Sequence, residues 1–148
     1  TGSPGVDEQL KILDFGLAKL MLDVDLAALT TKGEVFGTPW YMAPEQALGE
    51  PVDSRTDIYS FGSVAYELFV GHSPFPYRHL TQVLVALQRE RPRPLAEARP
   101  ADAPPLPERL ARFVMSCLEK DPEARPDRLA ALDRIVRSAF PDLAPPAT

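Results

Sequence analysis

The segment Asp57–Val70 constrains most strongly what this chain can fold into. Its apolar side chains spread around most of the circumference of a helix drawn through it: Ile58, Tyr59, Phe61, Val64, Ala65, Leu68 and Phe69. A helix that is apolar nearly all round is usually buried inside a protein. Gly71 follows as a helix stop signal. We therefore predict a buried helix over Asp57–Val70, which needs protein packed against most of its surface.

Further helices are predicted on both sides of this segment. Helical spacing of apolar residues indicates helices over Leu80–Arg89, Pro107–Leu118 and Asp127–Ala139, and Pro44–Leu48 is long enough for one turn. The proline-rich stretch Arg91–Pro107 is expected to be a connection. Gln9–Leu13 partly alternates, which favours a short strand, and Asp14–Trp40 is expected to be a long loop. The sequence thus predicts one strand, one long loop and mainly helices.

Composition places the chain among ordinary globular proteins. Of its 148 residues 45% are hydrophobic and 25% are charged, and the net charge of −5 gives no support for nucleic-acid binding. We find no signal peptide and no apolar stretch approaching the ~20 residues of a membrane span. A cytoplasmic location is expected for this domain, with a membrane anchor elsewhere in the full protein left open. Cys117, the single cysteine, is expected to be a buried thiol. His72 and His79 lack a metal-ligand context and are expected in loops or on the surface.

Four short motifs follow one another along the chain. Lys-Ile-Leu-Asp-Phe-Gly-Leu-Ala occupies Lys11–Ala18, and Gly-Thr-Pro-Trp-Tyr-Met-Ala-Pro-Glu occupies Gly37–Glu45. Asp-Ile-Tyr-Ser-Phe-Gly follows at Asp57–Gly62, and Asp-Pro-Glu-Ala-Arg-Pro at Asp121–Pro126. An isolated Asp-Phe-Gly triplet is a weak signal that a polar loop could carry by chance. Four motifs in this order and spacing form a specific pattern.

Over roughly Leu10–Ser138 the chain resembles eukaryotic-like serine/threonine protein kinase domains. Gln46 and the short loops resemble the bacterial type. The resemblance implies a protein-kinase-like α+β fold, of which this chain would be the mainly helical C-terminal lobe. We assign residues 1–139 to a partial kinase domain and residues 140–148 to a tail.

The resemblance gives the Asp-Phe-Gly motif a role in metal binding. Asp14 matches the carboxylate that holds Mg²⁺ against the phosphates of ATP, and the packing of Phe15 sets the active or inactive position of Asp14. Gly16 lets the backbone turn sharply behind Asp14. Phe15 could also be a simple core anchor. Thr30 and Thr31 fall where such kinases are often phosphorylated in the activation loop, and the alternative is two solvated loop threonines.

The second motif is implied to position the protein substrate. This segment comprises Gly37, Thr38, Pro39, Trp40 and Tyr41, and Thr38 matches a threonine that contacts the catalytic base. The sequence Gly-Thr-Pro-Trp-Tyr is the serine/threonine version of this segment. The resemblance therefore implies phosphorylation of Ser and Thr hydroxyls.

Three charged residues are implied to stabilise the lobe. Glu45 and Arg125 resemble the partners of a buried ion pair, and leaving one of them unpaired would cost about 3–5 kcal/mol. Asp57 resembles the carboxylate that bonds the catalytic-loop backbone. A plain interaction of Asp57 with the helix dipole would serve equally well at this position.

The resemblance implies a kinase that uses ATP and Mg²⁺ and acts on proteins, with dimerisation for trans-autophosphorylation as a further expectation. We find no Gly-rich loop, no ATP-binding Lys and no His-Arg-Asp loop in the chain. The catalytic Asp is expected upstream, so we expect the chain alone to be inactive. The alternative is a non-catalytic interaction module or pseudokinase remnant. The intact motif residues Asp14, Thr38, Glu45 and Arg125 favour the kinase.

Overall fold

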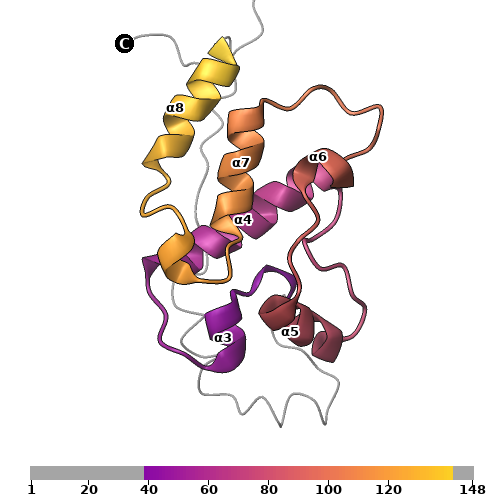
Figure 1. Cartoon of the computed structure of the whole chain (residues 1–148), viewed down its shortest axis with the longest axis vertical. Helices are drawn as coiled ribbons and strands as arrows, with labels where there is room; N and C mark the ends of the chain where they lie inside the picture. The colour runs from indigo at the N-terminus through magenta and orange to yellow at the C-terminus, as the bar shows by residue number, and fades with distance from the viewer. Residues whose placement is uncertain (1–38, 142–148) are drawn as a thin grey trace, which may run out of the picture. The chain divides into compact units, whose positions relative to one another are not determined.

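The computed structural model describes residues 39–141, and this part of the chain is helical (Figure 1). In chain order its elements are η1 (Pro39–Tyr41), α3 (Pro44–Leu48), α4 (Ser54–Val70), α5 (Leu80–Arg89), α6 (Leu95–Ala98), α7 (Glu108–Cys117), η2 (Pro122–Ala124) and α8 (Ala130–Ala139). The predicted strand Gln9–Leu13 and most of the predicted long loop lie outside the described residues.

Helix α4 is the long central element, and both of its ends have clear local causes. Asp53 precedes it and accepts a hydrogen bond from the backbone N–H of Arg55 at 2.8 Å, which satisfies one of the free donors of the first turn. The helix therefore starts at Ser54, three residues before the predicted start at Asp57. It ends at Gly71, which has a φ of 93° that few other residues tolerate.

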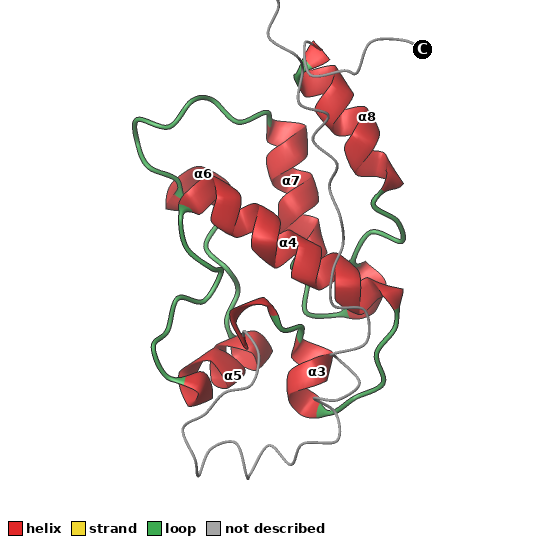
Figure 2. Cartoon of the chain, turned by 180° about the vertical axis from the view of Figure 1, so that it is seen from behind, coloured by secondary structure: helices red, strands yellow, loops and turns green. Residues whose placement is uncertain are grey.

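The other helices lie on two sides of α4. Figures 1 and 2 both show α3 and α5 on one side of α4 and α7 and α8 on the other. Helix α4 packs most extensively against α7, α7 packs against α8, and the short α6 touches both α4 and α7. The middle of the lobe is thus built around α4.

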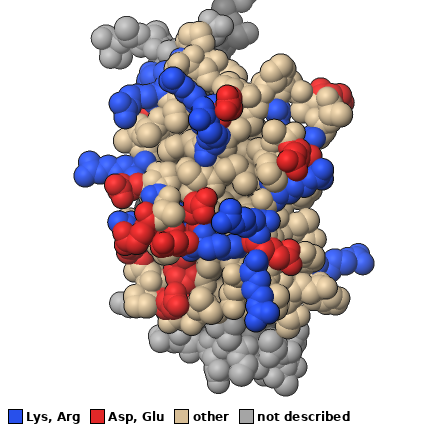
Figure 3. Space-filling model, in the orientation of Figure 1, with Lys and Arg blue, Asp and Glu red and all other residues tan. Residues whose placement is uncertain are grey.

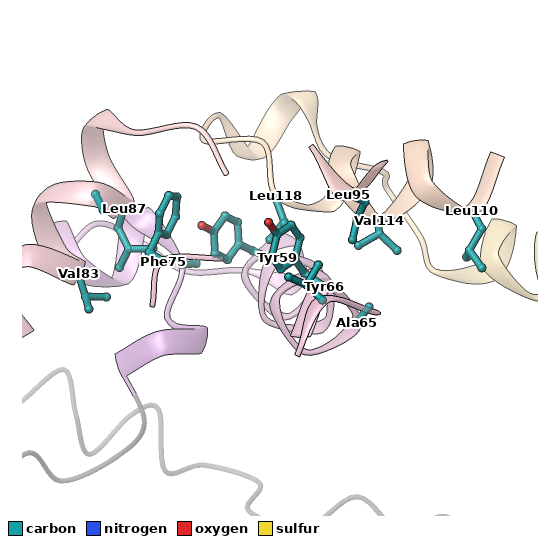
Figure 4. Close-up of a cluster of buried hydrophobic side chains, with 13 residues drawn as sticks. Tyr59, Ala65, Tyr66, Phe75, Val83, Leu87, Leu95, Leu110, Val114 and Leu118 are labelled. Atoms are coloured by element: carbon teal, nitrogen blue, oxygen red, sulfur yellow. The ribbon is translucent and has the colours of Figure 1, made fainter. Parts of the chain in front are cut away.

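The hydrophobic core forms where α4 meets its neighbours (Figure 4). Its largest fully buried side chains include Tyr59 and Tyr66 of α4, together with Leu87, Leu95 and Leu118. The hydroxyl of Tyr66 donates to the backbone carbonyl of Arg93 at 2.9 Å. This hydrogen bond lets a polar group enter the core at little cost.

Helices α4 and α7 approach each other closely at a glycine. A Cβ atom added to Gly62 would lie 2.6 Å from the Cβ of Cys117, closer than real Cβ contacts. Cys117 is fully buried there, as predicted, and burial raises the pKa of its thiol to about 12. The thiol is therefore a packing group and stays protonated at neutral pH.

The opposite face of α4 is not covered to the same degree. The side chains of Val64 and Leu68 are 46% and 80% exposed. Within this chain the strip of Val64 and Leu68 is therefore only partly covered, whereas the side that carries Tyr59 and Tyr66 is buried as predicted.

Most of the other predicted helices agree with the structure. Helix α5 has the predicted bounds, α3 is the predicted single turn, and α7 is one residue shorter at each end than predicted. Helix α8 begins at Ala130 instead of Asp127, because Leu129 still lies in a turn before it. Helix α6 was not predicted: it is a single turn inside the proline-rich connection, held by the buried side chain of Leu95.

Charges of both signs are interspersed on the face seen in Figure 3. Exposed pairs on the surface include Arg137 with Asp133, and Arg55 with Glu123. None of the helices within residues 39–141 is long and apolar enough to cross a membrane.

Candidate functional site

The side chains of Glu45 and Arg125 form a buried ion pair across the lobe. Two guanidinium nitrogens of Arg125 donate to the two carboxylate oxygens of Glu45, at 2.7 and 2.8 Å. The residues are 4% and 3% exposed. Such a parallel, charge-assisted pair is among the strongest hydrogen-bond arrangements in proteins.

Arg125 uses all of its hydrogen-bond donors in this position. Besides Glu45, it donates to the backbone carbonyls of Arg55 at 2.9 Å, Glu119 at 2.8 Å and Lys120 at 3.1 Å. A guanidinium group has five N–H donors, and the five bonds engage all of them. The group also lies over the ring of Tyr59, 4.9 Å from its centroid. Arg125 therefore ties α3, α4 and the segment after α7 together.

The environment keeps the Glu45 carboxylate ionised. Burial alone would raise its pKa, but hydrogen bonds from Arg125, from the backbone and from Thr56 outweigh burial, and the net pKa lies below its ordinary value of 4.5. The Thr56 hydroxyl donates to Oε1 of Glu45 at 2.8 Å. The sequence pattern did not point to Thr56, because one threonine in the first turn of a helix has no distinguishing spacing.

Short local signals place the two partners. Pro44 starts α3, where its missing N–H costs nothing, and the side chain of Gln46 accepts from the backbone N–H of Ala43 at 2.9 Å. Asp121 likewise accepts from the backbone N–H of Glu123 at 2.9 Å and starts η2, which delivers Arg125. The motif residues around the ion pair are therefore the caps that position it.

The segment Pro39–Tyr41, which lies two residues before α3, is fixed on α4 and on the α4–α5 connection. The indole N–H of Trp40 donates to the backbone carbonyl of Tyr77 at 3.0 Å, and the Tyr41 hydroxyl donates to Glu67 at 2.6 Å. The hydroxyl of Ser60 donates to the Tyr41 carbonyl at 3.0 Å. The hydrogen bond to Glu67 is the main cause that raises the pKa of Tyr41, since it needs the protonated phenol.

A cavity of about 420 Å³ opens beside this segment. It is lined by Trp40, Tyr41, Glu67, His72, Tyr77 and their neighbours. The hydroxyl of Tyr77 donates to Glu90 at the end of α5, at 2.7 Å, so the same tyrosine connects the cavity wall to α5. Glu67, Tyr77 and Glu90 were not singled out from the sequence, because their partners lie 13 or more residues away.

The remaining residues considered in the sequence have simpler surroundings. Asp57 is exposed in the first turn of α4, where a carboxylate interacts favourably with the helix dipole. His72 and His79 are exposed, and His72 hydrogen-bonds the carbonyl of Ser73. Within residues 39–141 no group of His, Cys, Asp and Glu is arranged to hold a metal ion.

Seven residues with predicted roles lie outside the described residues. They are Asp14, Phe15, Gly16, Thr30, Thr31, Gly37 and Thr38. Of the substrate-positioning segment the structure describes Pro39, which is buried, with Trp40 and Tyr41. The described part of the candidate site is therefore this segment and its anchor, the Glu45–Arg125 pair.

Comparison with known proteins decides the family. The family described as protein kinase domain matches residues 5–137. The chain belongs to the protein kinase domain family. The predicted resemblance is confirmed, and the helical architecture of residues 39–141 agrees with the C-terminal lobe of such a domain.

The relatives are bacterial serine/threonine kinases. Serine/threonine-protein kinase Pkn1 of Myxococcus xanthus is 40% identical over 131 residues, which cover 88% of this chain and 18% of that protein. PknB of Mycolicibacterium smegmatis is 39% identical over 78% of this chain and 18% of its own length. Serine/threonine-protein kinase A of Synechocystis is 36% identical over 97% of this chain and 26% of its own. The chain thus spans about a fifth of the length of these kinase relatives.

Proposed function

We propose that the protein containing this chain is an ATP-dependent kinase that phosphorylates Ser and Thr hydroxyls of proteins. In this proposal the chain contributes the segment that positions the protein substrate and the anchor of that segment. The relatives' names and the family support the reaction class. We further propose that this kinase domain acts in the cytoplasm.

The observation that carries the proposal is the fully bonded Arg125 beneath α3. Phosphoryl transfer depends mostly on positioning and charge neutralisation, so the segment that presents the acceptor hydroxyl must be held rigidly. The Glu45–Arg125 pair fixes α3 at the end of that segment, and the Tyr41–Glu67 hydrogen bond fixes the segment itself. A lobe that served only as a binding surface would not need this arrangement behind Pro39–Tyr41.

The other roles belong to residues outside the described part of the chain. The carboxylate of Asp14 is an oxygen ligand of the type that Mg²⁺ prefers, and we propose that it holds the ion. The bound ion would neutralise the phosphate charge of ATP. The packing of Phe15 would set the position of Asp14, Gly16 would allow the sharp turn behind it, and Thr38 would contact the catalytic base.

We propose that Thr30 and Thr31 are regulatory phosphorylation sites. A phosphate adds a charge of about −1.5 to −2 and can order a loop through arginine side chains. Autophosphorylation between two copies of the protein would be one source of it.

The test is phosphoryl transfer by the full-length protein. Purified protein is incubated with radiolabelled ATP, Mg²⁺ and dephosphorylated casein, and labelled amino acids are identified after hydrolysis. We expect phosphoserine and phosphothreonine with the wild type and none with Asp14→Asn. Asp102→Asn, in an exposed turn after α6, is the matched control and should retain the wild-type rate.

Two results would overturn the proposal. The first is a folded wild-type protein that transfers no phosphate under any of these conditions. The second is an Asp14→Asn variant as active as the Asp102→Asn control. Either result would favour the non-catalytic interaction module instead.

A further inference from the structure

Lys120 is held in an unusual position between α7 and η2. Its Nζ donates to the backbone carbonyl of Ala86 in α5 at 3.1 Å and lies 4.4 Å from the centroid of the Phe75 ring. Both partners are buried. Among the described residues, Ala86 supplies the one hydrogen-bond acceptor for a group that has three donors as an ammonium. The amine is therefore poorly solvated for a lysine.

Two cavities share Lys120 in their walls. One of about 540 Å³ is lined by residues of α3, by Gln88 and Arg89 of α5, and by Asp121. The other, of about 610 Å³, is lined by Arg91–Pro94, Met115 and Leu118. Both volumes exceed that of a small metabolite, so the half-buried side chain of Lys120 borders space that a small reagent can enter.

The charges around Lys120 are mixed. Glu90 favours the ammonium and Arg125 disfavours it, while Asp121 and Glu119 follow and precede Lys120 on the exposed surface. Burial is the largest influence, and the net effect lowers the pKa of Lys120 to about 8. A useful fraction of the amine is therefore neutral near pH 7.5.

We propose that Lys120 is a covalent acylation site, which accepts an acyl group from a small activated donor of the acyl phosphate class. The neutral amine donates one N–H to Ala86 and keeps its lone pair for attack on the acyl carbon. The new C–N bond forms, the bond from the acyl carbon to the phosphate oxygen breaks, and the electron pair leaves with phosphate. The nitrogen releases one proton to water, and nothing is oxidised or reduced.

Acylation would change the contact that Lys120 makes. The product is a neutral amide, so the cation over the Phe75 ring disappears. Phe75 precedes α5 and Ala86 lies within it, so the modification would weaken a connection between α5 and the segment that carries Arg125.

The test measures the acetylation rate of Lys120 in the folded full-length protein. Acetyl phosphate is added at pH values from 6.5 to 10.5, the reaction is stopped, and the remaining lysines are acetylated with an isotopically heavy reagent after denaturation. Cleavage at arginine releases Lys120 as the only lysine of Phe113–Arg128, because Pro126 protects the bond after Arg125. The ratio of light to heavy peptide gives the rate, and the synthetic peptide gives the unfolded reference.

We expect Lys120 in the protein to react roughly tenfold faster than the peptide at pH 7.5, since its larger neutral fraction outweighs its lower basicity. The rate should level off above about pH 8 in the protein, whereas that of the peptide keeps rising to about pH 10. A rate at or below that of the peptide at pH 7.5, or a profile that levels off only near pH 10, would overturn the proposal.

A variant of a nearby carboxylate tests whether the charges around Lys120 control its reactivity. Glu90→Gln removes the carboxylate that favours the ammonium, so its profile should level off at a lower pH and its rate at pH 7 should rise. Glu97→Gln, on the exposed surface of α6, is the matched control and should reproduce the wild-type profile. Identical profiles for the two variants would contradict the assigned surroundings of Lys120.

Discussion

The two faces of α4 differ in how tightly they are packed. On one face Gly62 lets α7 approach until a single added carbon would clash, and Tyr59 lies under the guanidinium of Arg125. On the other face Leu68 is 80% exposed. Both faces are apolar in sequence, so apolar composition alone does not indicate which side carries the stability of the lobe. The packed face should be sensitive to small changes and the open face should not.

The largest effect is expected from the anchor that adjoins the packed face. Arg125→Leu leaves the Glu45 carboxylate buried without its partner, and we expect a loss of about 3–5 kcal/mol in the free energy of unfolding. Urea denaturation of the full-length protein, followed by circular dichroism, measures it. Arg137→Leu breaks an exposed pair on α8 and is the control, with an expected loss far smaller than that of Arg125→Leu because solvent screens the pair. Equal losses for the two variants would mean that burial does not determine the strength of the anchor.

The stability lost in Arg125→Leu should depend on pH. The pKa of Glu45 is lowered in the folded protein, so its contribution is present above the ordinary pKa of 4.5 and is lost as the pH falls through the folded value. In Arg125→Leu, burial still raises the pKa of Glu45, but the hydrogen bonds from Arg125 that lower it are gone. The protonated acid is therefore favoured. The stability difference between wild type and variant should therefore be largest at pH 7 and shrink towards pH 3. A difference that does not change with pH would exclude the ionised carboxylate as its cause.

A smaller effect is expected inside the packed face. Replacing glycine by alanine within a helix usually stabilises it, but Gly62→Ala places a methyl group against Cys117 and should cost about 1–3 kcal/mol. Thermal unfolding compares Gly62→Ala, Cys117→Gly and the double variant. We expect the double variant to be more stable than the sum of the single changes implies. Additive losses would show that the contact with Cys117 is not responsible.

The smallest effect is expected on the open face. Leu68→Lys changes an exposed side chain, and its effect on the free energy of unfolding should stay within about 0.5 kcal/mol. Its charge should also raise the solubility of the protein, measured as the concentration that remains after centrifugation. A loss above about 2 kcal/mol would show that this face is covered in the native protein.

Local sequence rules predicted most of the helices, but they missed the start of α4 and the short helix α6. Val83 and Leu87 lie on the buried face of α5, as their spacing predicted, and Gly71 ended α4 as expected. The start of α4 was missed because the cap is Asp53, four residues before the motif that drew attention to Asp57. Helix α6 was missed because a single turn shows no periodicity, and only the tertiary burial of Leu95 stabilises it.

In the candidate site, too, some features were predicted from the sequence and others were not. The motifs singled out Glu45 and Arg125 as partners, and the structure pairs them. The bonds that hold Trp40 and Tyr41 were not predicted, because Tyr77 and Glu67 reach them from 37 and 26 residues away. No sequence pattern encodes such contacts; they depend on how α4 passes beneath the segment.

The separation of the anchor residues also bears on how the lobe folds. Glu45 and Arg125 are 80 residues apart, and closing a loop of that length has an entropic cost that local contacts such as those within α4 do not have. During synthesis, moreover, Glu45 emerges long before its partner exists. We expect the pair to form late, so that Arg125→Leu accelerates unfolding and hardly changes the refolding rate. Stopped-flow measurements distinguish this from an early nucleus, in which refolding would slow instead. The ion pair would then contribute mainly to kinetic stability, because it slows unfolding and so lengthens the lifetime of the folded lobe.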